Sequence, residues 1–566
     1  MAGASRAEKH VLFAARSATA LHRLLDVLPV FAGDDRIRRR FTLVPGSDFD
    51  ADALAAVERA GGRTIPWAEA VTRPHDLILA ASPKGGLAEL RGPRVLLPHG
   101  AGYNKALGEK TETESDGPGD SASGMAPALL MPGGRPLARL HALAHPSQVD
   151  RLATECPPAA ARATVTGDPT LDRVLASLPL RERYRAALRT HGRRLVVLTS
   201  TWGPHSLIRR HPGLPARLAA ELPHDTYQLG LVLHPNEHSR TGGFDLAQAL
   251  APALDAGMVL ARPHEEWAAL LVAADTVVTD HGSAALYAAA ARDVPVIAAG
   301  DGGGELIPGT PMAELLARVP VFTSLDRPTA ADLERAVAAH RPGVPAAAAG
   351  QAFAERGHAV RRLREELYRV LGLTPLDAPA EPRLLPDPAP PARSLAAFAV
   401  QIDRRGPHLH IERRPARSDA PAHHLAAEDG RASDTQLQSA GLLFRRAGHT
   451  AGHPVRGETW TVDGWTRHAL DEYGGPRTAA VALSASHCVL RRTGGALLSV
   501  RVEPHREPDG RIIRADAAAV LSGVHAWLVD HPGTPTVPVS IPCLIADRTH
   551  HATLAPATPA EAQQEI

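Results

Sequence analysis

The sequence predicts two doubly wound, Rossmann-like α/β domains followed by a small α+β domain. Short apolar runs alternate with helical patterns from about residue 10 to about residue 370, which is typical of strand–helix–strand units in a parallel sheet. A chain of 566 residues is also too long to fold around one core. We therefore expect domains at 1–175, 190–372 and 394–552, a proline-rich linker at 373–393 and a disordered tail at 553–566.

Six apolar runs in the first domain have the pattern of buried parallel strands, because each is continuous and bounded by polar, glycine or proline residues. They are residues 10–15, 41–44, 76–81, 94–98, 139–145 and 163–166. Helical patterns at 18–28 and 50–60 lie between them, so right-handed crossovers are expected. Residues 108–124 are polar and rich in Gly, Ser and Thr, which predicts a mobile surface loop.

The second domain repeats this alternation from Arg194 onward. Its expected strands are residues 195–199, 229–233, 257–260, 276–279 and 294–298. Its expected helices are residues 214–221, 265–273, 283–291, 331–340 and 352–370. The C-terminal block differs, with strand-like runs at 396–402, 479–483, 497–502 and 537–541 and one helix at 515–528. That mixture predicts the α+β domain.

The balance of charge argues against a general nucleic-acid binder, because Lys+Arg is 62 and Asp+Glu is 61. The sequence has no apolar run of about 20 residues, so no transmembrane segment is expected. Cys156, Cys488 and Cys543 form no Cys-x-x-Cys pair and suit a reducing compartment. The N-terminus does not resemble a signal peptide. We expect a cytoplasmic protein, with peripheral attachment at the inner membrane face left open.

Polar clusters follow several of the predicted strands, where doubly wound sheets bind their ligands. His99 and Gly100 follow the run at 94–98, with Lys105 close behind. A histidine in this position can act as a general base near neutral pH, although a turn histidine bonded to a backbone carbonyl is an equal alternative. Gly167 and Asp168 form a second cluster, for which a plain helix N-cap is the favoured interpretation.

Two further clusters belong to the second domain. Thr199 and Ser200 end a predicted strand, so their hydroxyls can bind phosphate or ribose, or cap the next helix. His234 and Asn236 flank a proline at the end of another strand. The proline holds the residue before it in an extended conformation, which presents the imidazole of His234 at the sheet edge.

The segment from Asp280 to Ser283 is the strongest of these signals. It joins a predicted strand to a helix of small residues, and its turn reads Asp280-His281-Gly282-Ser283. Glycine and serine at a helix start leave amide donors and a hydroxyl available, and the helix dipole favours an anion there. The alternative is an ordinary capped helix. A glycine-rich stretch at 300–304 could also approach a phosphate, but a glycine run alone is weak evidence.

The order of these clusters over residues 90–320 resembles the CDP-glycerol glycerophosphotransferase family, enzymes of the GT-B type that build teichoic-acid-like polyol phosphates. The matching stretches are His99-Gly100 with Lys105, Gly167-Asp168-Pro169, Thr199–Trp202, His234-Pro235 and Thr279–Ser283 followed by Val294–Ile297. The resemblance implies transfer of a glycerol phosphate-like group from a CDP-linked donor to a hydroxyl acceptor, which can be lipid-linked, in cell-envelope polymer synthesis.

The same resemblance implies roles for individual residues. His99 would take the proton of the acceptor hydroxyl, while His234 and the helix start at Gly282 and Ser283 would stabilise phosphate charge. Asp280 would orient His281 or a ribose. No cofactor is expected, and no metal either, because no carboxylate cluster suits Mg²⁺ and no histidine pair has a partner at zinc-ligand spacing.

Two departures from the family keep other functions open. The family's turn of one aromatic residue and two serines is replaced by His281, Gly282 and Ser283, and the helix at 284–291 lacks the expected acidic residue. A glycosyltransferase or a 2-epimerase acting on a UDP-linked sugar is one alternative, although the paired glutamates typical of the epimerases are missing at 284–291. An inactive scaffold that binds a nucleotide or a protein partner is the other.

Overall fold

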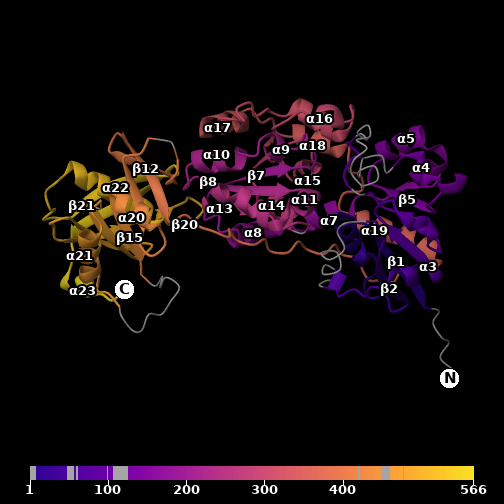
Figure 1. Ribbon diagram of the computed structural model, residues 1–566, viewed down its shortest axis with the longest axis horizontal. Coiled ribbons are helices and arrows are strands. Elements are labelled where there is room, and N and C mark those ends of the chain that lie inside the picture. Colours follow the sequence, from indigo (N-terminus) through magenta and orange to yellow (C-terminus); the bar gives the residue numbers. More distant parts are fainter. Residues whose placement is uncertain are drawn as a thin grey trace, which may run out of the picture.

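A computed structural model describes residues 8–46, 57–58, 61–98, 100–105, 125–264, 266–418, 421–447, 459–475 and 477–566. His99, most of the predicted helix at 50–60 and the predicted loop at 108–124 lie outside the described residues. The described chain forms three bodies in a row (Figure 1). Two α/β bodies lie side by side, and the C-terminal body lies beyond the second of them.

The first domain is built on a parallel sheet with the strand order β2-β1-β3-β4-β5-β6. Its strands are β1 Lys9–Ala15, β2 Ile37–Leu43, β3 Leu77–Ala80, β4 Arg94–Leu96, β5 Leu140–Leu143 and β6 Ala163–Val165. Its α-helices among the described residues are α1 Ala18–Leu25, α3 Trp67–Thr72, α4 Pro127–Leu130, α5 Pro146–Glu155 and α6 Pro157–Ala160. The predicted strands are confirmed, and their carboxyl ends share one edge of the sheet.

The second domain has a parallel sheet with the order β11-β10-β7-β8-β9. Its strands are β7 Arg194–Ser200, β8 Tyr227–Leu233, β9 Val259–Leu260, β10 Thr276–Thr279 and β11 Val296–Ala298. The helices are α7 Pro169–Ala176, α8 Arg181–Ala187, α9 Leu207–Arg210, α10 Leu214–Glu221, α11 Pro235–Thr241, α12 Gly243–Ala249, α13 Ala251–Asp255, α14 Glu266–Ala273, α15 Ala284–Ala291, α16 Pro311–Arg318, α17 Ala330–Ala338 and α18 Val344–Gly350. Both α/β domains therefore have the parallel sheets that the sequence predicts.

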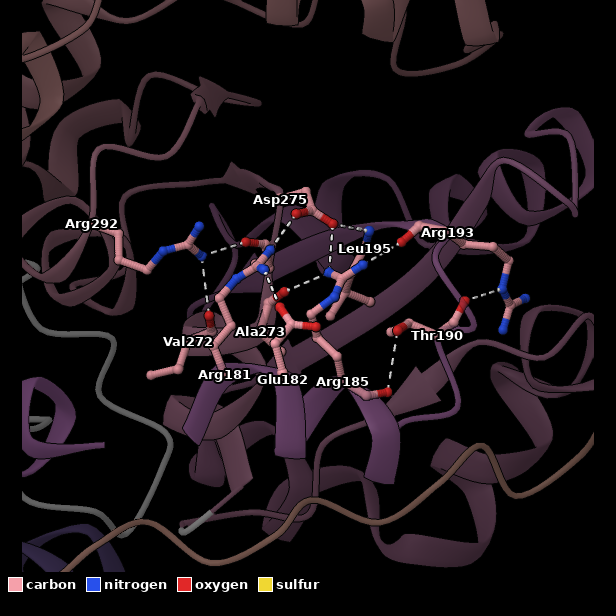
Figure 2. A network of polar contacts seen from close by, with 11 residues as sticks. Arg181, Glu182, Arg185, Thr190, Arg193, Leu195, Val272, Ala273, Asp275 and Arg292 are labelled. Carbon is pink, nitrogen blue, oxygen red and sulfur yellow. Dashed lines mark hydrogen bonds and ion pairs between the residues drawn. The ribbon is translucent and has the colours of Figure 1, made fainter. Parts of the chain in front are cut away.

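Helix α8 is held to the second sheet by a network of polar contacts around Asp275 (Figure 2). The Asp275 carboxylate accepts bonds from Arg181 at 2.5 Å, from Arg185 at 2.7 Å and from the backbone amide of Leu195 at 2.8 Å. Arg185 also donates to the carbonyl of Ala273. Because Asp275 directly precedes β10, this network fixes α8 at the amino ends of the strands, on the side of the sheet away from their carboxyl ends.

Helix α19, Ala359–Leu371, belongs to the first domain in space although the sequence assigns it to the second at 190–372. Its apolar face, with Val360, Leu363 and Leu367, joins the core cluster of β1 and α1, and Tyr368 donates to Asp34 at 2.9 Å. Gly167 allows α19 to pack this closely on the first domain, because a Cβ at position 167 would lie 2.8 Å from the Cβ of Ala359. An amphipathic helix packs on whichever core accepts its apolar stripe, and sequence position does not decide this.

Residues 373–393 contain no helix or strand and run in extended form along the second domain. Leu385 is buried, its amide donates to Ser177, and its carbonyl accepts from Tyr184 at 2.8 Å. Arg183 pairs with Asp387 at 2.7 Å. The proline-rich segment is thus anchored along its length while it connects α19 to the C-terminal domain.

The C-terminal domain is a closed barrel, which corrects the prediction of a small α+β domain at 394–552. Its strands, in barrel order, are β12 Ala397–Arg405, β13 His408–Pro415, β21 Val539–Ile545, β22 Arg548–Pro556, β18 Leu497–Val502, β17 His487–Arg492, β16 Thr478–Ser484, β15 Leu442–Arg446 and β14 His424–Glu428. The flanking elements are α20 Asp434–Ser439, α21 Val462–Glu472, α23 Pro559–Ala562 and the short pair β19 His505–Arg506 and β20 Ile512–Ile513. The strand-like runs predicted at 396–402, 479–483, 497–502 and 537–541 correspond to β12, β16, β18 and β21, and the helix predicted at 515–528 corresponds to α22, but their pattern does not indicate that the sheet closes.

Helix α22, Ala517–Asp530, packs inside this barrel. It contacts β12, β13, β15, β16, β17, β21 and β22, and it is apolar on nearly all sides. Such a helix is expected where every face is buried. The predicted disordered tail at 553–566 is also wrong in part, because β22 extends to Pro556, α23 follows it, and the amide of Ile566 bonds to the carbonyl of Trp460.

The barrel is fixed to the second α/β domain by a buried arginine. Arg413 of β13 is fully buried and pairs with Asp225 at 2.6 Å and with Asp516 at 2.9 Å. Asp516 in turn pairs with Arg446 at 2.8 Å. Removing one partner from such a network would leave a buried charge uncompensated, so this contact holds the two bodies in one orientation.

Helices long and apolar enough to cross a membrane are absent from the described part of the chain.

Candidate functional site

A cavity of about 260 Å³ lies between the two α/β domains, at the carboxyl ends of both sheets. The predicted site residues that line it are Gly100, Lys105, Thr199, Ser200, His234, His281, Gly282 and Ser283. Gly167, Asp168, Asn236 and Asp280 are not among the described residues that line it. The fold therefore brings most of the predicted polar clusters to one place, as the sheet-edge argument requires.

The start of α15 forms one wall of the cavity. Ser283 occupies the N-cap position, yet its side chain makes no capping hydrogen bond. Gly282 packs closely, because a Cβ there would lie 3.1 Å from Asp280 Oδ1 and 3.3 Å from the Cβ of Thr201. The first amides of α15 therefore lack a side-chain acceptor within the described residues, and this end of the helix can receive an anion.

Asp280 organises this wall from behind. Its buried carboxylate accepts bonds from the amides of Thr201 at 2.9 Å, Leu207 at 2.8 Å and Gly282 at 2.9 Å. Burial raises the pKa of Asp280, while the neighbouring imidazole of His281 and these amides act in the opposite direction. With its oxygens used in this way, Asp280 ties the turn after β10 to the loop after β7.

Thr199 and Ser200 use their hydroxyls within the protein. Thr199 Oγ1 donates to Thr279 at 2.7 Å, and Ser200 Oγ accepts from the amide of Ile208 at 3.1 Å. Both residues border the cavity, but the bonds hold the strand end and α9 together. The sequence left open whether these hydroxyls bind a ligand or cap the next helix. Their bonds within the protein favour a structural role at the start of α9 over ligand binding.

His234 caps α11 with its own ring. Nδ1 accepts from the amide of Asn236 at 3.2 Å, so the proton of the neutral imidazole is on Nε2. The ring lines the cavity and lies 6.2 Å from the Trp202 ring. His145 does the same in the first domain, where its Nδ1 accepts from Ser147 at 3.1 Å before α5. The His-Pro sequence thus recurs as a helix start after a strand in both domains.

Asp168 is a helix N-cap, as the favoured interpretation of its cluster predicts. It accepts from the amides of Thr170 at 2.8 Å and Leu171 at 3.1 Å at the start of α7. Its other oxygen accepts from Tyr287 of α15 at 2.7 Å, and Arg23 of α1 lies 3.6 Å away. Asp168 therefore joins three helices at the base of the cavity.

Lys105 closes the cavity from the first domain. Its Nζ lies 3.0 Å from Glu305 Oε2 and donates to the carbonyl of Trp202 at 3.0 Å. Glu305 Oε2 also lies 3.1 Å from His281 Nε2. The neighbouring Asn104 accepts from the amide of Met312 at 3.2 Å. These contacts bridge the two domains, so the ammonium group of Lys105 is paired with groups of the second domain.

Several cavity residues carry no signal in sequence. His141 of β5 is buried, lines the cavity, and has an Nε2 without a hydrogen-bond partner among the described residues. Burial, with a contribution from Arg162, lowers its pKa to about 4. His22 and His264 stack at 4.6 Å across the two domains. A histidine inside an apolar strand or helix pattern resembles a core residue, so only the packing of the domains reveals these positions.

Groups of three or more His, Cys, Asp or Glu side chains arranged to hold a metal ion do not occur in the described ranges.

The comparisons with known proteins find similarity only between structures. No family model matches the sequence, and no curated protein sequence matches it. The UDP-GlcNAc 2-epimerase from Neisseria meningitidis bound to UDP-GlcNAc is 13% identical, with a TM-score of 0.40 over 64% of this chain and 100% of that one. The wall teichoic acid polymerase TagF is 11% identical, with a TM-score of 0.43 over 64% and 89%. Anabaena HepE in complex with UDP and glucose is 16% identical, with a TM-score of 0.39 over 64% and 100%.

Proposed function

We propose that the protein is a GT-B-type transferase that binds a nucleotide-linked donor in the cavity between its two α/β domains. The start of α15 carries this proposal. Gly282 and Ser283 line the cavity there, and no side chain of the described residues caps the helix. Free amides and the helix dipole favour an anionic group, and the diphosphate of a nucleotide donor is such a group. The position at the carboxyl ends of two parallel sheets supports the same ligand class.

The finer proposal is transfer of a glycerol phosphate-like group from a CDP-linked donor to a hydroxyl acceptor. The motif resemblance supports it. In this reaction the acceptor oxygen attacks the β-phosphorus of the donor and forms a new P–O bond. The P–O bond to CMP breaks, and CMP leaves with the electron pair. Acceptors of this kind can be lipid-linked intermediates of cell-envelope polymers.

The roles of three groups follow from this scheme. His99, which lies outside the described residues, takes the proton of the acceptor hydroxyl. His234 stabilises the phosphate charge from the cavity wall, where the bond from the Asn236 amide to Nδ1 fixes the orientation of its ring. The first amides of α15 and the Ser283 hydroxyl complete the cradle for the phosphate charge that grows during transfer.

A panel of nucleotides in a thermal-shift assay tests the proposal. We expect CMP and CDP to raise the melting temperature and UDP to raise it less, because ligands that bind only the folded state stabilise it. A larger shift with UDP would favour a sugar-nucleotide glycosyltransferase or a 2-epimerase-like enzyme instead. No shift with any of the three at millimolar concentration would contradict nucleotide binding and leave the inactive protein-binding scaffold as the remaining function.

A further inference from the structure

His281 is held in one orientation by a carboxylate. The side chain is fully buried in the wall of the cavity, and its Nε2 lies 3.1 Å from Glu305 Oε2. A carboxylate accepts hydrogen bonds, so the proton of the neutral ring is on Nε2. Nδ1 then carries a lone pair. This buried nitrogen has no hydrogen-bond partner in the part of the chain that the structure describes.

The charges around this ring set its protonation state. Asp280 lies beside it on the same turn, Glu305 faces Nε2, and Lys105 reaches the same Glu305 oxygen from the first domain at 3.0 Å. Burial lowers the pKa of His281, and Lys105 acts in the same direction, while Asp280 and Glu305 oppose them. The ring is therefore neutral near pH 7 when the cavity holds no anion.

An anion at the start of α15 would change this balance. His281 directly precedes Gly282 and Ser283, so a phosphate bound by the first amides of the helix lies beside the ring. A neutral ring gains no charge attraction from such an anion, whereas a ring protonated at Nδ1 carries a positive charge that the anion stabilises. The added negative charge favours the protonated form, and Glu305 stabilises the resulting imidazolium from the other side.

We propose that binding of the donor phosphates at the start of α15 is coupled to the uptake of one proton by His281. The inference rests on the proposed function, because it needs an anion at that helix start. The proton comes from solvent, the N–H bond forms at Nδ1, and no bond of the nucleotide changes in this step.

Titration calorimetry with CDP at pH 7.5 tests the coupling. The same titration in buffers of different ionisation enthalpy gives the number of protons exchanged per CDP bound. We expect the wild-type protein to take up roughly one proton. His281→Gln should bind CDP more weakly and take up none. His75→Gln is the matched control, since His75 is a buried histidine that is not among the described residues lining the cavity, and it should keep the uptake.

The outcomes separate this inference from the proposed function. CDP binding without proton uptake, or uptake that persists in His281→Gln, overturns the coupling and leaves the nucleotide site intact. Failure of both CDP and UDP to bind overturns both proposals. Where His281→Gln does not fold, ¹⁵N NMR of the histidine rings in the wild-type protein replaces it. One ring should then pass from the neutral to the doubly protonated form on saturation with CDP, and an unchanged set of ring signals counts against the coupling.

Discussion

Two histidines in the cavity wall, His234 and His281, both carry the proton of the neutral ring on Nε2. The protein binds His234 through Nδ1 and His281 through Nε2. His234 accepts an amide at Nδ1, which places the proton of the neutral ring on Nε2. His281 uses Nε2–H on Glu305, which leaves the lone pair of Nδ1. The hydrogen bond at one nitrogen thus decides what the other can do, and two identical side chains supply different chemistry in one cavity.

Substitutions at Gly282 and Ser283 distinguish an anion site from an ordinary helix cap. Gly282→Val should weaken CDP binding at least tenfold, because the new side chain meets Thr201 and Asp280 at the helix start. Ser283→Ala should cost about 0.5–1.5 kcal/mol of binding energy, the value of one hydrogen bond, and leave the melting temperature unchanged because Ser283 makes no capping bond. Calorimetry of binding and of unfolding measures both quantities.

The control for Gly282→Val is Gly243→Val, at an exposed second-domain glycine where a Cβ would meet no atom within 4 Å. It should leave both affinity and melting temperature close to wild type. CDP binding at wild-type strength by Gly282→Val would rule out phosphate at this helix start. Loss of melting temperature in Ser283→Ala, with affinity unchanged, would instead return Ser283 to a capping role.

For single residues, the sequence predicts the location of the candidate site better than the role of each residue in it. The turn at 280–283 could be located because glycine and serine at a helix start after a buried strand are readable signals. Asp280 was expected to orient His281 or a ribose, yet its oxygens bind three backbone amides. Two of those partners, Thr201 and Leu207, are 79 and 73 residues away in the chain, and no local pattern encodes such a contact.

At the scale of elements, the barrel contains a pair of neutral histidines. His424 of β14 and His525 of α22 have ring centroids 4.6 Å apart, and His525 Nδ1 lies 2.8 Å from the Thr478 hydroxyl. Burial lowers the pKa of His424 to about 3 and that of His525 to about 4. Both rings are neutral in the folded barrel and protonate readily once it unfolds.

This pair should make the protein sensitive to mild acid. Between pH 6.5 and 4 the unfolded chain binds protons that the folded barrel does not, so stability falls as pH falls. Each histidine contributes up to about 1.4 kcal/mol per pH unit in that window, and the loss levels off below the folded pKa values. His424→Leu should flatten the slope of melting temperature against pH. The exposed His551 provides the control, since His551→Leu should keep the wild-type slope; an unaltered slope in His424→Leu would contradict this account.

The elements also show what periodicity can predict. Strands β7, β8 and β10 lie where continuous apolar runs placed them, because a parallel strand covered on both faces has an unmistakable pattern. The barrel was missed because its strands are partly exposed and some pair in parallel with distant partners, as β13 does with β21. The sequence pattern of a single strand does not indicate whether its sheet closes into a barrel.

At the scale of the whole molecule, the chain passes between the two α/β domains more than once. It enters the second domain through α7 and α8, and it returns to the first before α19. In the structure, Lys105 and Glu305 bridge the domains at 3.0 Å, as do Asn104 and Met312 at 3.2 Å. These bridges join the two domains beside the cavity.

We expect the cleft to open and close about residues 167–193 and the helix expected at 352–370, so that bound nucleotide makes the molecule more compact in solution. We expect solution scattering to give a smaller radius of gyration with saturating CDP than without it. Lys105→Ala should have a larger radius in the absence of nucleotide, because it loses the bridge to Glu305. Superimposable profiles with and without CDP, for both proteins, would be evidence against closure.

The order of the barrel strands has a consequence for how the protein is made. The ring is sealed by β21 and β22, which fill the gap between β13 and β18 and follow α22 in the chain. During translation, the apolar helix α22 therefore leaves the ribosome before the two strands that enclose it have been synthesised. Until residue 556 has emerged, every nascent chain exposes both the helix and two unpaired strand edges, which are surfaces that chaperones recognise and that otherwise aggregate.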